Sequence, residues 1–241
     1  MLHINAMIKI AVFLLLFINQ AFSKVTCDKV IQNSSQLLLV LADDYNSTTA
    51  NLERYEKRKE LWHKAGKSLQ VYVGRNGMAP AKGLCKIAHK KLNEKQEGDG
   101  KSPSGIFNLT SSFGKNLDVN FKTDYFQVKK TLHCIDDVNS KFYNMIIEES
   151  KGYGSHEVML RDDGLYDLGA VVEYNTDPTV PKAGSCIFLH ISANRPTAGC
   201  TSIEKENLEE LLQWLDKKKN PILIQMPIST YRGLSIGSLI K

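Results

Sequence analysis

His190 and Cys200 are the residues of this sequence whose types and spacing best fit a chemical reaction. A cysteine thiolate is a strong nucleophile, and a nearby imidazole can take the thiol proton and later return it to a leaving amine. Gly199, directly before the cysteine, permits a sharp turn with positive φ. The backbone N–H of Cys200 can then point at a developing oxyanion. These three residues predict acyl transfer through a covalent cysteine intermediate.

The surrounding sequence indicates how the pair is positioned. Residues 187–189 (Ile-Phe-Leu) have the length and composition of a buried strand that ends at His190. Pro196 and Gly199 indicate that a turn-rich loop follows. A helix is expected after Cys200, with Ser202 as its N-cap. Its apolar face is formed by Leu208, Leu211, Leu212 and Leu215. A thiol at a helix N-terminus has a lowered pKa, so this arrangement favours catalysis.

The alternative is a buried structural cysteine beside a satisfied core histidine. For an isolated cysteine and histidine that alternative is the more common one. Here the histidine, the glycine, the cysteine and the expected helix start agree with one another, which favours the catalytic interpretation.

The same residues carry a family resemblance. His190 followed by residues 196–200 (Pro-Thr-Ala-Gly-Cys) resembles the active-site motif of the YkuD-type L,D-transpeptidase catalytic domain, in the branch with a Pro-Thr-x-Gly-Cys motif. Residues 73–77, 97–107 and 159–163 are similar to the same branch. The better-known branch has a histidine where this chain has Ala198, and often Arg or Asn where it has Ser202. Substrate contacts made at those two positions are therefore not transferred.

The resemblance implies a reaction and its substrate. Cys200 would attack a peptidoglycan tetrapeptide stem at the bond to the terminal D-Ala, His190 would protonate the leaving D-Ala, and an amine of a second stem would resolve the thioester. No metal or organic cofactor is implied, and carbapenem-type β-lactams are expected to acylate the same thiol. Two alternatives stay open: an L,D-carboxypeptidase, in which water resolves the thioester, and a wall-binding module with a silent site.

Further substrate-binding candidates surround the pair. Thr197 is expected to hydrogen-bond the site or to hold the loop, and Arg195 to meet a substrate carboxylate with its forked donors. The resemblance adds four residues as cleft candidates, and core packing is the alternative for the tyrosines. They are Tyr166, Asp167, Tyr174 and Asn175.

Residues 1–23 are predicted to be a signal peptide, because Lys9 precedes an apolar run that is too short to span a membrane. Residues 24–241 then form one catalytic domain, located in the periplasm or secreted to the bacterial cell wall, with no stable membrane insertion. The formal net charge of +5 suits an anionic wall polymer as well as an ordinary solvated surface. The basic runs 57–59 and 217–219 lack interleaved aromatics, so a nucleic-acid partner is not expected. Oligomeric state is left open.

The five cysteines predict disulfides in an exported chain. If Cys200 is free, the other four can pair in three ways. None has the C-x-x-C spacing of zinc or redox motifs. Cys134 and Cys186 flank expected core strands and are predicted to pair, which leaves Cys27 for Cys85.

Many short strand patterns and few helices predict a mostly-β fold, and the resemblance implies a single-domain β-sandwich with a few peripheral helices. Strands are expected at 36–42, 69–73, 106–109, 187–189 and 221–226, and a short helix at 142–148. Residues 158–160 and 165–174 are expected to pair as a hairpin across Gly164. The resemblance implies another hairpin within 51–64. The irregular stretch 74–104 and the loop 174–181 are expected to form the walls of the active-site cleft.

Overall fold

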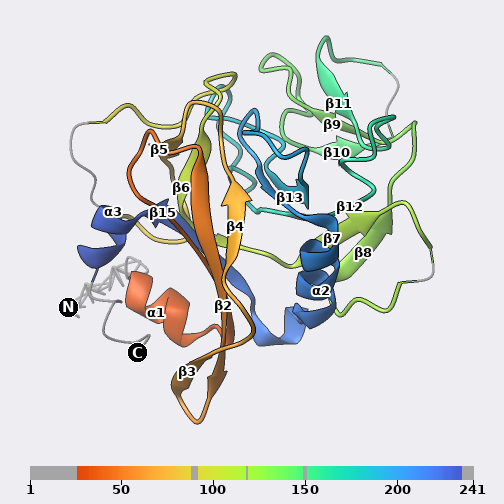
Figure 1. Ribbon diagram of the computed structural model, residues 1–241. Coiled ribbons are helices and arrows are strands. Elements are labelled where there is room, and N and C mark those ends of the chain that lie inside the picture. Colours follow the sequence, from red (N-terminus) through yellow and green to blue (C-terminus); the bar gives the residue numbers. More distant parts are fainter. Residues whose placement is uncertain (1–25, 88–91, 118, 149–150, 235–241) are drawn as a thin grey trace, which may run out of the picture.

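The computed structural model describes residues 26–87, 92–117, 119–148 and 151–234 (Figure 1). The predicted signal peptide lies outside these ranges. The described residues form a single, mostly-β domain, as the sequence predicts.

A 12-stranded mixed sheet forms most of the domain. Its strands in spatial order are β5 (Met78–Pro80), β6 (Ser102–Asn108), β15 (Ile222–Pro227), β1 (Gln36–Ala42), β2 (Thr49–Arg58), β4 (Leu69–Tyr72), β14 (Thr201–Ile203), β13 (Phe188–Ile191), β12 (Leu168–Val171), β7 (Ser111–Gly114) and β8 (Asp124–Gln127), with β3 (Leu61–Lys64) paired to β2. A separate three-stranded sheet contains β10 (Ile146–Ile147), β9 (His133–Ile135) and β11 (His156–Val158). The helices are α1 (Cys27–Gln32), α2 (Lys205–Trp214), the 3₁₀ turn η1 (Lys217–Lys219) and α3 (Ile228–Arg232).

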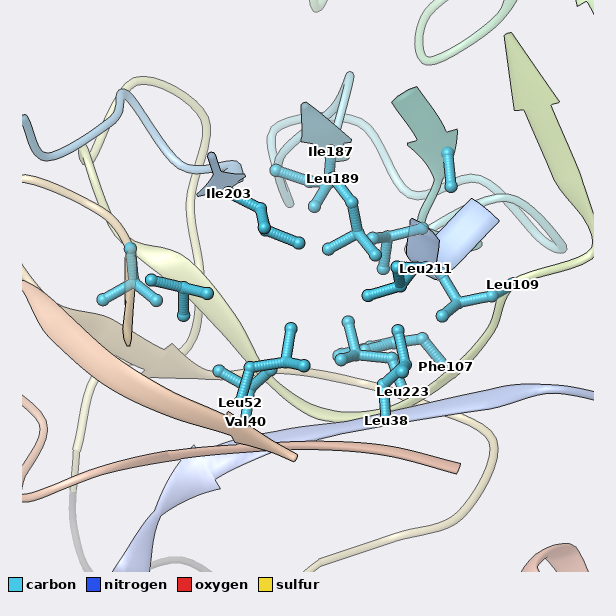
Figure 2. Packing of buried hydrophobic residues seen from close by; sticks show 14 of the residues in the cluster. Leu38, Val40, Leu52, Phe107, Leu109, Ile187, Leu189, Ile203, Leu211 and Leu223 are labelled. Carbon is cyan, nitrogen blue, oxygen red and sulfur yellow. The ribbon is translucent and has the colours of Figure 1, made fainter. Parts of the chain in front are cut away.

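The large sheet curls around the main core. Figure 2 shows Leu38 of β1 and Leu223 of β15 across from Leu189 of β13, with Leu211 of α2 beside them. All four of these side chains are buried. Burying such aliphatic side chains contributes about 1.5–3 kcal/mol each, so the curl is stabilised by the apolar surface that it encloses.

Strand β1 is covered on both faces, which explains its unbroken apolar sequence. Leu38 and Val40 point into the main core, whereas Leu37 and Leu39 pack in a second cluster with Ile31 of α1. The expected strands at 36–42, 69–73, 187–189 and 221–226 are confirmed to within a few residues. The hairpin within 51–64 is confirmed as β2 and β3.

Three expectations about local structure are wrong. The region 142–148 is not helical; it holds a turn and the short strand β10, which pairs with β9. Segments 158–160 and 165–174 do not form a hairpin, because β11 joins the small sheet while β12 pairs with β7 and β13. The helix does not begin at Cys200: β14 comes first, and α2 is preceded by Glu204 as N-cap instead of Ser202.

Both predicted disulfides are present. Cys27 bonds to Cys85 and Cys134 to Cys186, which leaves Cys200 as the free cysteine. The second bond matters for the site, because it fastens the small sheet to the segment directly before β13.

Candidate active site

Strands β13 and β14 bring the predicted pair together. The two strands run parallel, with His190 opposite Ser202 and Leu189 opposite Thr201. Cys200 directly precedes β14, so the loop between the strands returns its thiol to the strand that carries His190. Both residues line one cavity of about 560 Å³, and each is only 7% exposed.

The thiol is held by backbone groups on the neighbouring strand. The Phe188 N–H donates to the Cys200 sulfur at 3.3 Å, and the Cys200 S–H donates to the Cys186 carbonyl oxygen at 3.4 Å. Cys186 itself is disulfide-bonded to Cys134. The sulfur position therefore depends on the segment that the disulfide fastens.

The loop before Cys200 is fixed by Thr197. Its hydroxyl donates to the Cys200 carbonyl at 2.6 Å and accepts the Gly199 N–H at 3.1 Å. Its backbone joins the loop to the segment after β4, through Val73 and Arg75. Of the two roles considered for Thr197, these bonds match holding the loop.

Gly199 has the positive φ that the sequence predicts. Its φ of 159° is one that residues with a side chain rarely adopt. A Cβ at this position would lie 3.2 Å from the carbonyl oxygen of Lys101. A side chain would therefore crowd the strand that carries Ser102, whose hydroxyl donates to the Cys200 carbonyl at 3.0 Å.

One ring nitrogen of His190 is hydrogen-bonded to the backbone. Nδ1 lies 2.8 Å from the Ile191 carbonyl oxygen, an acceptor, so Nδ1 carries the proton and Nε2 is left with its lone pair. Burial lowers the pKa of His190 to about 4, so the ring is neutral at neutral pH. A neutral imidazole with an open lone pair is the form that a general base requires.

The Cys200 thiol does not have the lowered pKa that the sequence predicts. Burial raises its pKa to about 12, and the negative charge of Glu157 acts in the same direction. The sequence interpretation expected a helix N-terminus to lower this pKa, but β14 separates the cysteine from α2. The resting pair is a neutral thiol beside a neutral imidazole.

Tyr166 is the predicted cleft residue that lies closest to this pair. Its ring packs edge-on against His190, with centroids 5.2 Å apart, and its hydroxyl donates to Glu157. Hydrogen bonding from the same hydroxyl acts to lower the pKa of the Cys200 thiol. The Arg161 guanidinium lies 5.0 Å above the same ring. Arg195 is exposed on the cavity wall.

The other three cleft candidates lie elsewhere. Tyr174 and Asn175 line a neighbouring cavity of about 410 Å³, with Lys95 lining both cavities. The Asn175 side chain is used within its own loop, where it bonds Val180 and the Gly184 carbonyl. Asp167 lines neither of these two cavities; its carboxylate lies 4.0 Å from the Lys115 ammonium.

The cavity also contains charged residues that the sequence interpretation did not select. Glu157 is contributed by β11 and Asp136 follows β9, so both come from the small sheet. Glu97 accepts hydrogen bonds from the hydroxyls of Tyr143 and Ser185. An acidic residue directly before the apolar run 158–160 was the available signal for Glu157, because a partly buried carboxylate in a strand requires a partner.

A comparison with family models identifies the chain's relatives. The model of the YkuD L,D-transpeptidase catalytic domain matches residues 44–224. The chain belongs to this family. The match includes β13, β14 and the cavity residues described above, so the chain is a member of a family of L,D-transpeptidase-type enzymes that act on peptidoglycan. Searches among curated proteins and solved structures gave no match.

Two further findings concern the described residues alone. They contain no group of three or more histidine, cysteine, aspartate or glutamate side chains placed to hold a metal ion. Among the same residues, no helix is long and apolar enough to cross a membrane.

Proposed function

We propose that this protein is an exported L,D-transpeptidase that cross-links peptidoglycan, with Cys200 as nucleophile and His190 as general base and acid. The observation that carries the proposal is the placement of a free thiol directly before β14 and a neutral imidazole on the adjacent parallel strand β13, both lining one cavity, within a family match of 181 residues. The two disulfides support export, because such bonds persist in oxidising compartments.

The first step is acylation. His190 Nε2 takes the Cys200 proton as the sulfur attacks the carbonyl carbon of the stem's third residue. The proton moves during the attack, because the resting thiol is neutral. The Gly199 N–H is occupied by Thr197, so we assign the Cys200 N–H to the developing oxyanion. His190 then donates the proton to the leaving D-Ala amine, and a thioester remains.

The second step transfers the acyl group to an acceptor. An amine of a neighbouring stem loses a proton to His190 as it attacks the thioester, and the Cys200 thiol is regenerated. The Ile191 carbonyl keeps the ring oriented in both steps through Nδ1–H. Arg195 and Arg75, both exposed on the cavity wall, are positioned to meet substrate carboxylates.

The test is digestion of purified cell wall, with the fragments resolved by mass. Cross-linked dimers that appear with wild-type protein, and not with Cys200→Ala, are the expected result. Trimmed tripeptides without dimers would show that the protein is an L,D-carboxypeptidase and not a transpeptidase. Unchanged wall, with retention of the protein on it, would establish a binding module with a silent site.

A further inference from the structure

Glu157, Tyr166 and Cys200 form a chain of hydrogen-bonding groups that the proposed mechanism does not use. The Tyr166 hydroxyl donates to a Glu157 carboxylate oxygen at 2.5 Å. The Tyr166 and Cys200 side chains pack in the same buried cluster, and hydrogen bonding from the Tyr166 hydroxyl acts to lower the pKa of the Cys200 thiol. Tyr166 is only 5% exposed, so solvent cannot easily substitute for these interactions.

A hydroxyl has one hydrogen to donate, and this limits the chain to two arrangements. An ionised Glu157 only accepts, so the Tyr166 hydrogen goes to Glu157 and the Cys200 sulfur receives none from it. A neutral Glu157 can donate its own hydrogen to the Tyr166 oxygen. The Tyr166 hydrogen is then available to the sulfur, in addition to the Phe188 N–H.

We propose that Glu157 is a positioning residue that sets the reactivity of Cys200 through Tyr166, with the neutral carboxyl as the activating state. The inference rests on the proposed role of Cys200 as the nucleophile. As the thiol proton leaves for His190, Glu157 keeps its proton and Tyr166 donates its hydrogen to the sulfur anion. Two donors, Tyr166 and the Phe188 N–H, then stabilise the thiolate that attacks.

The groups around Glu157 favour its neutral form. Burial raises the pKa of Glu157, and the Asp136 and Glu97 carboxylates act in the same direction, whereas the Tyr166 hydrogen bond and Arg161 oppose them. Arg161 is only partly available, because Asp163 binds its guanidinium through two oxygens.

The carboxylate neighbour Asp136 adds to this environment. Its Oδ1 is buried and has no hydrogen-bond partner among the described residues. The Asp136 carboxylate beside Glu157 makes a second negative charge costly there.

The test measures the pH dependence of Cys200 alkylation by iodoacetamide in substrate-free, disulfide-intact protein. The other four cysteines are disulfide-bonded, so the reaction reports on Cys200. In Glu157→Gln the amide can donate to Tyr166, as a neutral carboxyl does. The alkylation midpoint should move down by about one pH unit or more, because the wild-type carboxyl is ionised at the midpoint pH, with a rate increase of about ten-fold just below the midpoint. The double variant Glu157→Gln/Tyr166→Phe should lose this gain.

Glu148→Gln is the matched control, because Glu148 follows β10 of the same small sheet but is exposed and paired with Lys129. Its alkylation profile should match that of wild type. A Glu157→Gln midpoint that stays in place or rises would overturn the proposal, and so would a double variant that equals Glu157→Gln.

An infrared measurement covers the case in which Glu157→Gln does not fold. Wild-type protein near neutral pH should retain the C=O stretch of a neutral carboxylic acid, and the absence of that band would contradict the inference. Neither measurement uses wall or stem peptide. A failure of the proposed function and a failure of this inference can therefore be distinguished.

Discussion

At the scale of single residues, Cys200 and His190 are both shifted away from their charged forms. Burial raises the pKa of the thiol to about 12 and lowers that of the imidazole to about 4. A resting thiolate–imidazolium pair would need both shifts reversed. Proton transfer is therefore coupled to the attack on the substrate: the sulfur bonds to the carbonyl carbon, and the carbonyl oxygen takes up the negative charge.

Replacing Cys200 by alanine should abolish acyl-enzyme formation and leave the fold intact. The hydrogen bonds of the thiol sulfur to the Phe188 N–H and the Cys186 carbonyl are long, at 3.3 and 3.4 Å, so their loss should cost little stability. Mass spectrometry after incubation with a carbapenem should show one adduct on wild type and none on Cys200→Ala. Circular dichroism provides the folding control. An adduct on the alanine variant would remove Cys200 from the nucleophile role.

The His190→Gln variant should lower turnover by roughly 10²–10⁴-fold, the usual contribution of a general acid–base group. The glutamine amide can still donate to the Ile191 carbonyl, so the loss is chemical and not structural. The pH midpoint of Cys200 alkylation should stay in place, because the wild-type ring carries no positive charge at neutral pH for the variant to lose. A clear rise of that midpoint would indicate a resting imidazolium.

His190 also makes stability depend on pH in a defined direction. Its pKa is about 4 in the folded protein and 6.5 as a free side chain. Between these values the unfolded chain binds more protons, so stability falls as pH decreases from 6.5 to 4. The loss amounts to about 3 kcal/mol. Urea unfolding of wild type and His190→Gln across this range should show a flatter acid limb in the variant; parallel curves would contradict the burial argument.

At the scale of elements, the two disulfides close loops of comparable length but join different parts of the fold. Their sequence separations are 52 and 58 residues, so loop-closure entropy gives each about 4 kcal/mol of stability. The Cys134–Cys186 bond joins the small sheet to the segment that contacts the Cys200 thiol. The Cys27–Cys85 bond joins α1 to a loop remote from these contacts.

Serine replacement of each pair should therefore separate stability from site geometry. Both double variants should lose similar stability in urea unfolding. The Cys134→Ser/Cys186→Ser variant should also lose carbapenem acylation, whereas Cys27→Ser/Cys85→Ser should keep it. Equal acylation by the two folded variants would show that the small sheet is not required to position Cys200.

The elements also show where sequence patterns are informative. Strands β1, β13 and β15 were predictable, because a run of aliphatic residues buried on both faces has no helical periodicity. Strand β14 was missed, because it has three residues and owes its existence to pairing with β13 and β4. The sequence pattern predicts the start of the helix at these residues. Strand β10 was missed for a similar reason, because it has two residues and depends on its pairing with β9.

At the scale of the whole molecule, the site draws on segments far apart in the chain. The cavity is lined by Arg75 after β4, by Lys95, Glu97 and Gly98, and by parts of the small sheet, β13 and the loop before β14. The motif around Cys200 is local and was found from the sequence. Glu157 and Asp136 were not found, because their relevance depends on how the small sheet docks. The expectation that stretch 74–104 walls the cleft is met by Arg75, Lys95 and Glu97, whereas residues 176–180 line the neighbouring cavity.

The fate of the thioester is a property of this whole cavity. Water is far more abundant than any amine, so transpeptidation requires walls that orient an acceptor and limit hydration. A buried thiol that lines a cavity of about 560 Å³, with exposed arginines on the wall, fits that requirement. We expect the acceptor amine to be preferred over water.

The measurement of that preference is a partition ratio. Purified enzyme receives one tetrapeptide donor and increasing amounts of a stem-peptide amine, and dimer and tripeptide are counted by mass spectrometry. Dimer should rise with acceptor while tripeptide falls, because both products come from one thioester. Cys200→Ala should give neither product. Tripeptide that stays constant at every acceptor concentration, with no dimer, would mean that the cavity admits water and holds no acceptor, and the protein would then be an L,D-carboxypeptidase.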